Sequence, residues 1–275
     1  MSRLVCYLPS YNDSELVAQS LATVPDWDVV ISDNASDPAH AAALDRLASP
    51  RVQVIHQPRQ LGRVGNWQFC VEHFLSGGTG GASWMKFLLA GDRHKPDSLA
   101  ICERTIERFP QARFIITGVD MLLPNARRTS IDAPGPFVLQ PPEAMLEVVR
   151  QGNVFFGLLA ALIHADAVRD GFTFGEELLN YCADMYFLVN IGRRCPTLFE
   201  PELVSEFVSA NRKVYQVAQH SLEHLVEECL VQLRAAHYYG DAVGDPRARD
   251  PLVPGIADWL RSGLNATDKI QEARQ

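Results

Sequence analysis

Two aspartates in this sequence stand directly after apolar runs, at places where a bound ligand could meet them. Asp33 ends the run that starts at Trp27, and Asp92 ends the run that starts at Ser83. The first position suits hydrogen bonds to a base or a ribose, whereas the second suits a divalent cation, because Mg²⁺ and Mn²⁺ prefer carboxylate oxygens. Either acid could also be a turn residue that stops a strand, so the elements around the two acids decide the interpretation.

The elements that carry these acids follow a regular order. Apolar runs alternate with amphipathic stretches over 3–9, 14–24, 27–34, 38–48 and 52–57. Strands of about four to eight residues that alternate with helical patterns predict parallel strands joined by crossover helices. The run 83–92 reads as a further strand, buried on both faces. The sequence therefore predicts an α/β fold with a Rossmann-like, mostly parallel sheet flanked by helices.

Other residues at the predicted strand ends could line the same site. Ligands bind beyond the carboxyl ends of the strands in an open parallel sheet, near the point where the strand order reverses. The residues that follow the first four strands include Pro9, Ser10, Tyr11, Asn12, Asn34, Ser36, Asp37, the segment 57–66 and Gly91. Each of them alone fits a turn, and it is their combination that indicates a binding site.

The second half of the chain is less regular and ends in a predicted helical extension. A long helix is expected at 213–238, and its apolar face comprises Val214, Val217, Ala218, Leu222, Leu225, Cys229 and Leu233. This i, i+3, i+4, i+7 spacing is typical of a helix that packs on its own core, on a second copy or on a membrane. A short helix is expected near 256–264. We predict one domain over 1–212 and an extension over 213–275.

Composition narrows the class of protein. The chain has 275 residues and a formal net charge of −8, which argues against a nucleic-acid binder because such proteins carry a basic face. The six cysteines form no CxxC pair, and the first residues lack the apolar core of a signal peptide. No apolar run approaches the roughly 18 residues that a membrane helix needs. We expect a reduced, cytoplasmic protein.

Five segments, taken in order, resemble those of the family 2 glycosyltransferases of the GT-A fold. They are "LPSYND", "VVISDNASDP", "QLGRVGNWQFCVEH", "WMKFLLAGDRHKP" and "FGEELLNYCADMYFLVNIG". The resemblance covers roughly residues 4–212 and implies a nucleotide-sugar binding half over 1–123 and an acceptor-side half over 124–212. It implies that the donor is held by Pro9, Tyr11, Asn12, Asp33, Asn34, Arg63, Asn66, Gly91 and Asp92.

The acidic motif of that family departs from its usual form here. The positions that often read DxD or DxDD are Leu-Ala-Gly-Asp, so only Asp92 remains as a metal ligand. A single carboxylate is still compatible with Mn²⁺ or Mg²⁺ that is held mainly by a diphosphate. The alternative is that Arg93, His94 and Lys95 neutralise the diphosphate, and the same triplet also fits a solvated loop.

The resemblance implies a second carboxylate that acts as a base. An inverting sugar transfer needs a group that takes the proton of the acceptor hydroxyl as the new bond forms. The matching segment places Asp184 there, with Ala183 where a further acid is usual. Asp184 also fits a first-turn acid favoured by a helix dipole, and Glu176 and Glu177 are the fallback candidates.

The leading hypothesis is an inverting, hexosyltransferase-like enzyme that moves a sugar from a UDP or dTDP sugar to an acceptor hydroxyl. The acceptor would be a glycan, a lipid-linked molecule or a small molecule in polysaccharide or glycoconjugate biosynthesis. A homodimer through the long helix, or peripheral contact with the inner face of the membrane, is compatible with its apolar face. The alternatives are a nucleotide-sugar binding protein without catalysis and a dinucleotide-dependent oxidoreductase, which is weaker because no GxGxxG follows the first strand.

Overall fold

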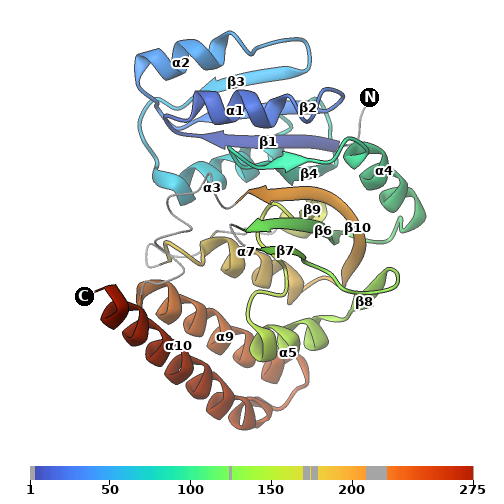
Figure 1. Cartoon of the computed structure of the whole chain (residues 1–275). Helices are drawn as coiled ribbons and strands as arrows, with labels where there is room; N and C mark the ends of the chain where they lie inside the picture. Colours follow the sequence, from blue (N-terminus) through green and yellow to red (C-terminus); the bar gives the residue numbers. More distant parts are fainter. Residues whose placement is uncertain (1–3, 124–125, 170–173, 175–178, 209–221, 275) are drawn as a thin grey trace.

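The computed structural model describes residues 4–123, 126–169, 174, 179–208 and 222–274, and only the backbone over 265–274. One mixed sheet forms its centre (Figure 1), with the strand order β3-β2-β1-β4-β9-β6-β10-β5. The strands are β1 Leu4–Ser10, β2 Asp28–Asp33, β3 Val52–His56, β4 Trp84–Phe87, β5 Arg93–His94, β6 Phe114–Leu123, β7 Ala126–Thr129, β8 Phe137–Leu139, β9 Ala161–His164 and β10 Thr197–Val208.

The sheet changes character between β4 and β9. The first four strands are parallel neighbours, as the sequence predicts. β9 then lies antiparallel between β4 and β6, and β10 runs parallel to β6. The short β5 pairs antiparallel with the far side of β10, whereas β7 and β8 pair with β6 and β10. The predicted fold class is confirmed: a mixed α/β sheet flanked by helices, followed by a helical C-terminal region.

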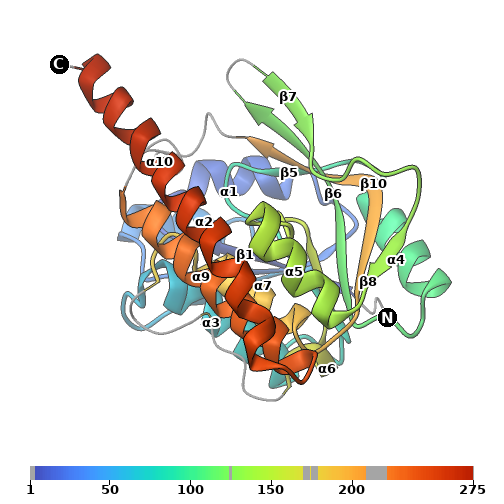
Figure 2. The same ribbon diagram turned by 90° about the horizontal axis from the view of Figure 1, so that it is seen from below.

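Helices cover both faces of the parallel strands. The helices are α1 Ser14–Leu21, α2 Pro38–Asp45, α3 Gly62–Leu75, α4 Ser98–Arg108, α5 Pro141–Gln151, α6 Ala165–Val168, α7 Ala183–Gly192, α9 Leu222–Ala242 and α10 Val253–Arg274, with a 3₁₀ helix at Pro246–Leu252. α1 and α3 lie on opposite sides of β1 (Figure 2). Every residue of β1 is buried, as expected of a strand that helices cover on both faces.

The C-terminal helices pack on the domain rather than standing apart from it. α9 contacts α5, α7 and α10, and the three helices α5, α9 and α10 lie together (Figure 1). α10 is longer than the short helix predicted near 256–264. None of the described helices combines the length and the apolarity that a membrane crossing requires.

The predicted apolar face of the long helix is wrong in part. Leu222 and Leu233 are exposed, at 53% and 41%, although the spacing places them on the packed face. The buried positions of α9 are instead Glu227, Cys229, Val231, Gln232, Ala235, Ala236 and Gly240. Glu227 is buried on this face because its carboxylate accepts hydrogen bonds from backbone N–H groups before α7. The homodimer through this helix stays a prediction, as do the domain boundaries, and Val214, Val217 and Ala218 lie outside the described residues.

Candidate active site

The carboxyl ends of the first three strands align in one row. Ser10 on β1 pairs with Asp33 on β2, which pairs with His56 on β3. Asp33 is 1% exposed, and its Oδ1 accepts a hydrogen bond from the backbone N–H of Ser36 at 3.2 Å. Its Oδ2 lies 2.7 Å from Nδ1 of His56. The predicted donor-binding acid is therefore fixed at the sheet edge by its neighbours in the same half of the chain.

His56 links Asp33 to a second acid that is exposed to solvent. Its Nε2 lies 2.9 Å from Oδ1 of Asp45, which is the last residue of α2. The hydrogen bonds to Asp45 and Asp33 raise the pKa of His56 above its ordinary value of 6.5. Sequence reasoning missed this imidazole, because the partners of a single histidine at a strand end are set by packing.

Asn12 ties the turn after β1 to the turn after β2. Its backbone N–H donates to Oγ of Ser36 at 2.8 Å, and its Oδ1 accepts from the backbone N–H of Asp37 at 2.8 Å. Beside it, Tyr11 is 43% exposed and offers an aromatic face to solvent. Pro9 is buried within β1, whereas Oγ of Ser10 is buried without a hydrogen-bond partner among the described residues.

Asn34 and Asn66 hold the start of α3 against the end of β2. Asn34 Oδ1 accepts from the backbone N–H of Leu61 at 2.7 Å, and its Nδ2 donates to the carbonyl of Gly62 at 3.1 Å. Asn66 is 3% exposed, and its side chain makes two hydrogen bonds to Ser32. Its Oδ1 accepts from Oγ of Ser32 at 2.6 Å, and its Nδ2 donates to the carbonyl of Ser32 at 3.0 Å. The two predicted donor-binding residues thus join the end of β2 to the start of α3, and for Asn66 this geometry supports a structural role.

Gly91 and Asp92 are held by a different set of contacts. The Oγ of Ser20, on the last turn of α1, accepts from the backbone N–H of Gly91 at 2.9 Å and donates to the carbonyl of Asp92 at 2.7 Å. The Asp92 side chain is fully buried, and its Oδ1 accepts from the backbone N–H of Val208 at the end of β10, at 3.0 Å. Gly91 has a φ of 92°, a conformation that suits glycine.

The described residues do not form a metal site by themselves. No group of three or more histidine, cysteine, aspartate or glutamate side chains in the described part of the chain could enclose a cation. Asp92 offers one carboxylate, and one of its oxygens already binds a backbone N–H. The donor set therefore does not fit a protein-enclosed metal, and no catalytic step below is routed through one.

The three basic residues after Asp92 differ in their surroundings. His94 is 3% exposed, and burial lowers its pKa well below the ordinary value, so its ring is neutral at pH 7. Lys95 pairs with Asp120 at 3.1 Å and with Glu206 at 2.5 Å. Only Arg93 of this triplet has an exposed side chain. The alternative in which all three cations face a diphosphate is not supported.

Arg63 connects the start of α3 to the segment before α7. Its guanidinium lies 5.0 Å from the centre of the Trp67 ring and donates a hydrogen bond to the carbonyl of Asn180. Trp67 in turn is buried against Phe174, with ring centres 5.7 Å apart. The predicted donor residue Arg63 therefore also holds the segment that leads to Asp184.

Asp184 lies on the first turn of α7 and faces the backbone of a glycine. Its Oδ1 accepts from the backbone N–H of Met185 at 2.8 Å. A Cβ atom at Gly157 would lie 3.0 Å from its Oδ2, and Gly157 has a φ of 76°. The loop before β9 thus passes directly beside this carboxylate because residue 157 has no side chain. The fallback candidates Glu176 and Glu177 lie outside the described residues.

A buried lysine donates a hydrogen bond to the loop before β9. Lys86 on β4 is fully buried, and its Nζ donates to the carbonyl of Leu159 at 2.7 Å and to Oγ1 of Thr117 at 3.2 Å. Burial lowers its pKa to about 8. Sequence reasoning did not single out Lys86, although a lysine inside an apolar strand is a signal of a buried polar contact.

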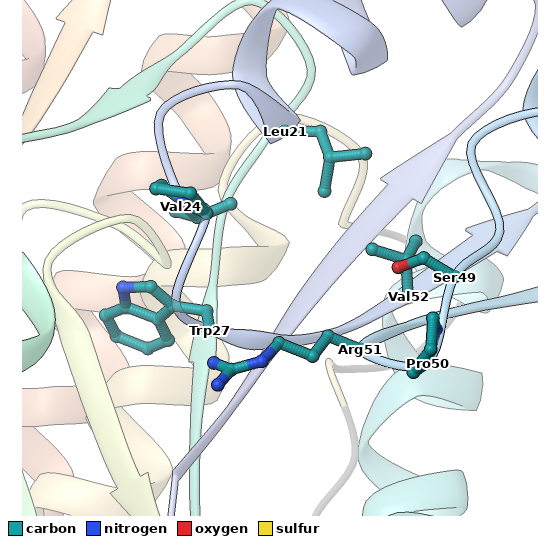
Figure 3. A pocket seen from close by; sticks show the side chains of 8 residues that line it. Leu21, Val24, Trp27, Ser49, Pro50, Arg51 and Val52 are labelled. Carbon is teal, nitrogen blue, oxygen red and sulfur yellow. The ribbon is translucent and has the colours of Figure 1, made fainter.

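A surface pocket with a volume of about 340 Å³ lies elsewhere. Figure 3 shows Trp27, Arg51 and Val52 among the side chains that line it. Trp27 precedes β2, and Val52 begins β3, so the pocket lies at the amino ends of these strands. Asp33 lies at their carboxyl ends, and this pocket is therefore not the predicted donor site.

Comparisons with known proteins agree with the predicted resemblance. Residues 6–126 match the model of the family described as glycosyl transferase family 2. The chain is similar to the crystal structure of TarS 1–349 from S. aureus, with a TM-score of 0.62 and 10% identity over 99% of this chain and 92% of that one. The same fragment in complex with UDP-GlcNAc gives a TM-score of 0.61 and 10% identity over the same shares of the two chains.

The chain is also similar in fold to a mannosyltransferase. The mannosyltransferase PcManGT from Pyrobaculum calidifontis, solved with GDP-Man and Mn²⁺, has a TM-score of 0.56 and 15% identity over 97% of this chain and 83% of that one. No curated protein matches the chain. At these identities the structures show the fold alone, which is that of the GT-A glycosyltransferases, and the family match confirms the predicted resemblance for residues 6–126.

Proposed function

We propose that this chain is an inverting, hexosyltransferase-like glycosyltransferase that moves a sugar from a nucleotide-sugar donor to an acceptor hydroxyl. The observation that carries the proposal is the position of Asp184. Its carboxylate lies beside the side-chain-free backbone of Gly157, and the segment that precedes α7 accepts a hydrogen bond from Arg63 of α3 through the carbonyl of Asn180. A direct displacement needs a base at the acceptor hydroxyl, and we assign that role to Asp184.

The chemistry assigned to the residues is a single displacement. The acceptor oxygen attacks the anomeric carbon while the bond from that carbon to the diphosphate oxygen breaks, and the nucleoside diphosphate leaves with the bonding electrons. Asp184 takes the proton of the acceptor hydroxyl. Asp33, Asn12 and Tyr11 bind the nucleoside at the sheet edge, with the tyrosine ring available for stacking on the base. Pro9, Asn34, Arg63, Asn66 and Gly91 shape the pocket around it.

A divalent cation, Mn²⁺ or Mg²⁺, belongs to the proposal only as an ion that the donor brings. A structure similar to this chain was solved with Mn²⁺, and Asp92 is the single protein ligand that the sequence offers. Such an ion would supply charge neutralisation of the diphosphate when bound.

The donor and the cellular setting are proposed from the similar structures and from the cysteines. UDP-GlcNAc and GDP-Man are bound by two of the similar structures, and a UDP or dTDP sugar is the donor we propose. Each of the six cysteines is free, which supports a reduced cytoplasmic setting. The proposed acceptor is a glycan, a lipid-linked molecule or a small molecule in polysaccharide or glycoconjugate biosynthesis, reached in the cytoplasm or at the inner face of the membrane.

A second candidate function is a nucleotide-sugar binding protein without catalysis. One observation favours it: glycine stands at position 91 of the acidic motif, and Asp92 is buried with one oxygen bound to Val208. This candidate shares the donor site with the first and differs from it only in turnover.

The test compares wild-type protein with Asp184→Asn and with Glu223→Gln, an exposed acid on α9. Donor hydrolysis or transfer is followed by ³¹P NMR with UDP, dTDP and GDP sugars, and the anomeric configuration of the product by ¹H NMR. We expect inversion, and a loss of turnover of about 10²- to 10⁴-fold in Asp184→Asn alone.

Binding separates the two candidates. Calorimetric titration of the nucleoside diphosphates should give the same dissociation constants for all three proteins. Retention of configuration, or full turnover in Asp184→Asn, would contradict the proposed mechanism. Tight donor binding by the wild type with no turnover of any donor would favour the binding protein.

A further inference from the structure

Glu227 on α9 accepts three backbone hydrogen bonds from the segment that leads into α7. Its Oε1 accepts from the N–H of Asn180 at 3.0 Å, and its Oε2 accepts from the N–H groups of Tyr181 and Cys182 at 2.7 and 2.8 Å. The Glu227 residue is 8% exposed. We call Glu227 with the amides of residues 180–182 the Glu227 clamp. The three donors lie at the N-terminal end of a helix, where a carboxylate is favoured by the helix dipole.

Further contacts hold α9 along α7. At the start of both helices, the thiol of Cys182 lies 3.8 Å from the carbonyl of His224. At their ends, the Tyr238 hydroxyl donates to Oδ1 of Asn190 at 3.1 Å, and the Arg193 guanidinium lies 4.2 Å from the centre of the Tyr238 ring. The two helices therefore run side by side in the same direction, so the Glu227 carboxylate is fixed relative to the first turn of α7.

Asn180 makes hydrogen bonds to Glu227 and to Arg63, which lies in residues 1–123. The N–H of Asn180 donates to Glu227, while its carbonyl accepts from the guanidinium of Arg63 on α3. The segment before α7 is thus held between the donor half and the C-terminal helices. Asp184 follows this segment by two residues, and its carboxylate has to lie beside Gly157.

We propose that Glu227 is a positioning residue that fixes the carboxylate of Asp184 through the Glu227 clamp. The inference rests on the proposed role of Asp184 as the base. Replacing Glu227 with glutamine removes the negative charge at the N-terminus of α7. It also replaces one acceptor oxygen with an N–H₂ group that cannot accept a hydrogen bond. At least one of the three amides then faces a donor instead of an acceptor, and the segment shifts to find another partner. A shift of about 1 Å at a catalytic group can cost about 10²-fold in rate.

The experiment compares Glu227→Gln with Tyr238→Phe, which removes a hydrogen bond at the other end of the same helix pair. Amide hydrogen exchange over 179–186 measures the clamp directly. We expect faster exchange of the amides of Tyr181 and Cys182 in Glu227→Gln and wild-type exchange there in Tyr238→Phe. We expect kcat to fall about 10- to 100-fold in Glu227→Gln, with the donor KM within about 3-fold of wild type. Glu227→Asp, which keeps the charge, should retain more of kcat than Glu227→Gln.

The double variant with Asp184→Asn tells a positioning role from a structural one. In the Asp184→Asn background, Glu227→Gln should cause no further loss of rate, while the exchange at 181–182 still increases. Unchanged exchange, or a loss of kcat no larger than that of Tyr238→Phe, would overturn the inference. Full activity of Asp184→Asn alone would instead overturn the proposed base, and in that case faster exchange in Glu227→Gln would still establish the clamp.

Discussion

Two parts of the proposed site are positioned in different ways: the donor edge, which comprises Asp33 with Tyr11 and Asn12, and the base segment, which comprises residues 180–184. Asp33 lies at the end of a strand and is fixed by Ser36, three residues later, and by His56 on the adjacent strand. Asp184 lies on a helix whose preceding segment is held by a residue of α9, since Glu227 follows Asn180 by 47 positions. Parallel strands deliver the first acid to the edge by their own geometry. The second acid depends on a helix outside the family match at residues 6–126.

This difference teaches where each kind of substitution should act. Changes at the donor edge should alter nucleotide binding, because these residues contact one another and are the ones that we propose bind the donor. Changes around α7 should alter turnover with little effect on donor binding. The three predictions below test this division, from the largest expected effect to the smallest.

Asp92→Ala should have the largest effect on stability and on binding. The substitution leaves the buried N–H of Val208 without its acceptor, which costs about 1–3 kcal/mol of unfolding free energy. Asp92→Asn keeps an acceptor oxygen and should cost less. Urea unfolding measures both, and calorimetry with and without Mn²⁺ measures the binding of UDP. Metal-dependent UDP binding should be lost in both variants, and its survival in Asp92→Asn would remove Asp92 from the proposed donor site.

Gly157→Ala should lower turnover without weakening donor binding. The new Cβ would lie 3.0 Å from Oδ2 of Asp184, and the φ of 76° is unfavourable for alanine. We expect a loss of about 1 kcal/mol of unfolding free energy or somewhat more, and a reduced kcat. Steady-state kinetics and urea unfolding check both effects. An increased dissociation constant for UDP with an unchanged kcat would break the proposed division between donor edge and base segment.

His56→Gln should change how stability depends on pH. Hydrogen bonds to Asp45 and Asp33 raise the pKa of His56 in the folded state above its ordinary value of 6.5. Protonated His56 therefore stabilises the folded state, and this stabilisation is fully present at pH values below 6.5. This stabilisation is lost as the pH rises through the folded-state pKa. The unfolding free energy of the wild type should therefore fall relative to that of His56→Gln as the pH rises above about 6.5. Urea unfolding at several pH values measures this, and parallel profiles would contradict it.

Much of the fold and of the donor edge could be predicted from the sequence. The alternation of apolar runs and amphipathic stretches gave the parallel strands, because a buried strand and a crossover helix each leave a local pattern. The position of Asp33 and Asn12 at one edge of the sheet could be predicted for the same reason, since residues after parallel strands share an edge, and their role in donor binding stays a prediction. Their hydrogen-bond partners, such as His56, required the three-dimensional packing.

The C-terminal region resisted prediction for a physical reason. Hydrophobic spacing assumes that apolar side chains are the buried ones, and it placed Leu222 and Leu233 on the packed face of α9, where the structure exposes them. Glu227 is buried because three amides from a distant segment satisfy its carboxylate. No local pattern in the sequence shows that such partners exist.

The Glu227 clamp also sets an order of events during synthesis of the chain. The parallel strands β1 to β4 pair with one another and need no later residue for these pairs, whereas Asp92 has to wait for the N–H of Val208. The amides of residues 180–182 form their hydrogen bonds to Glu227 only after residue 227 has been synthesised. Domains form as their residues leave the ribosome. A growing chain with the proposed activity would therefore form its parallel strands first, hold Asp92 after β10 has emerged, and order its proposed base last, when α9 docks.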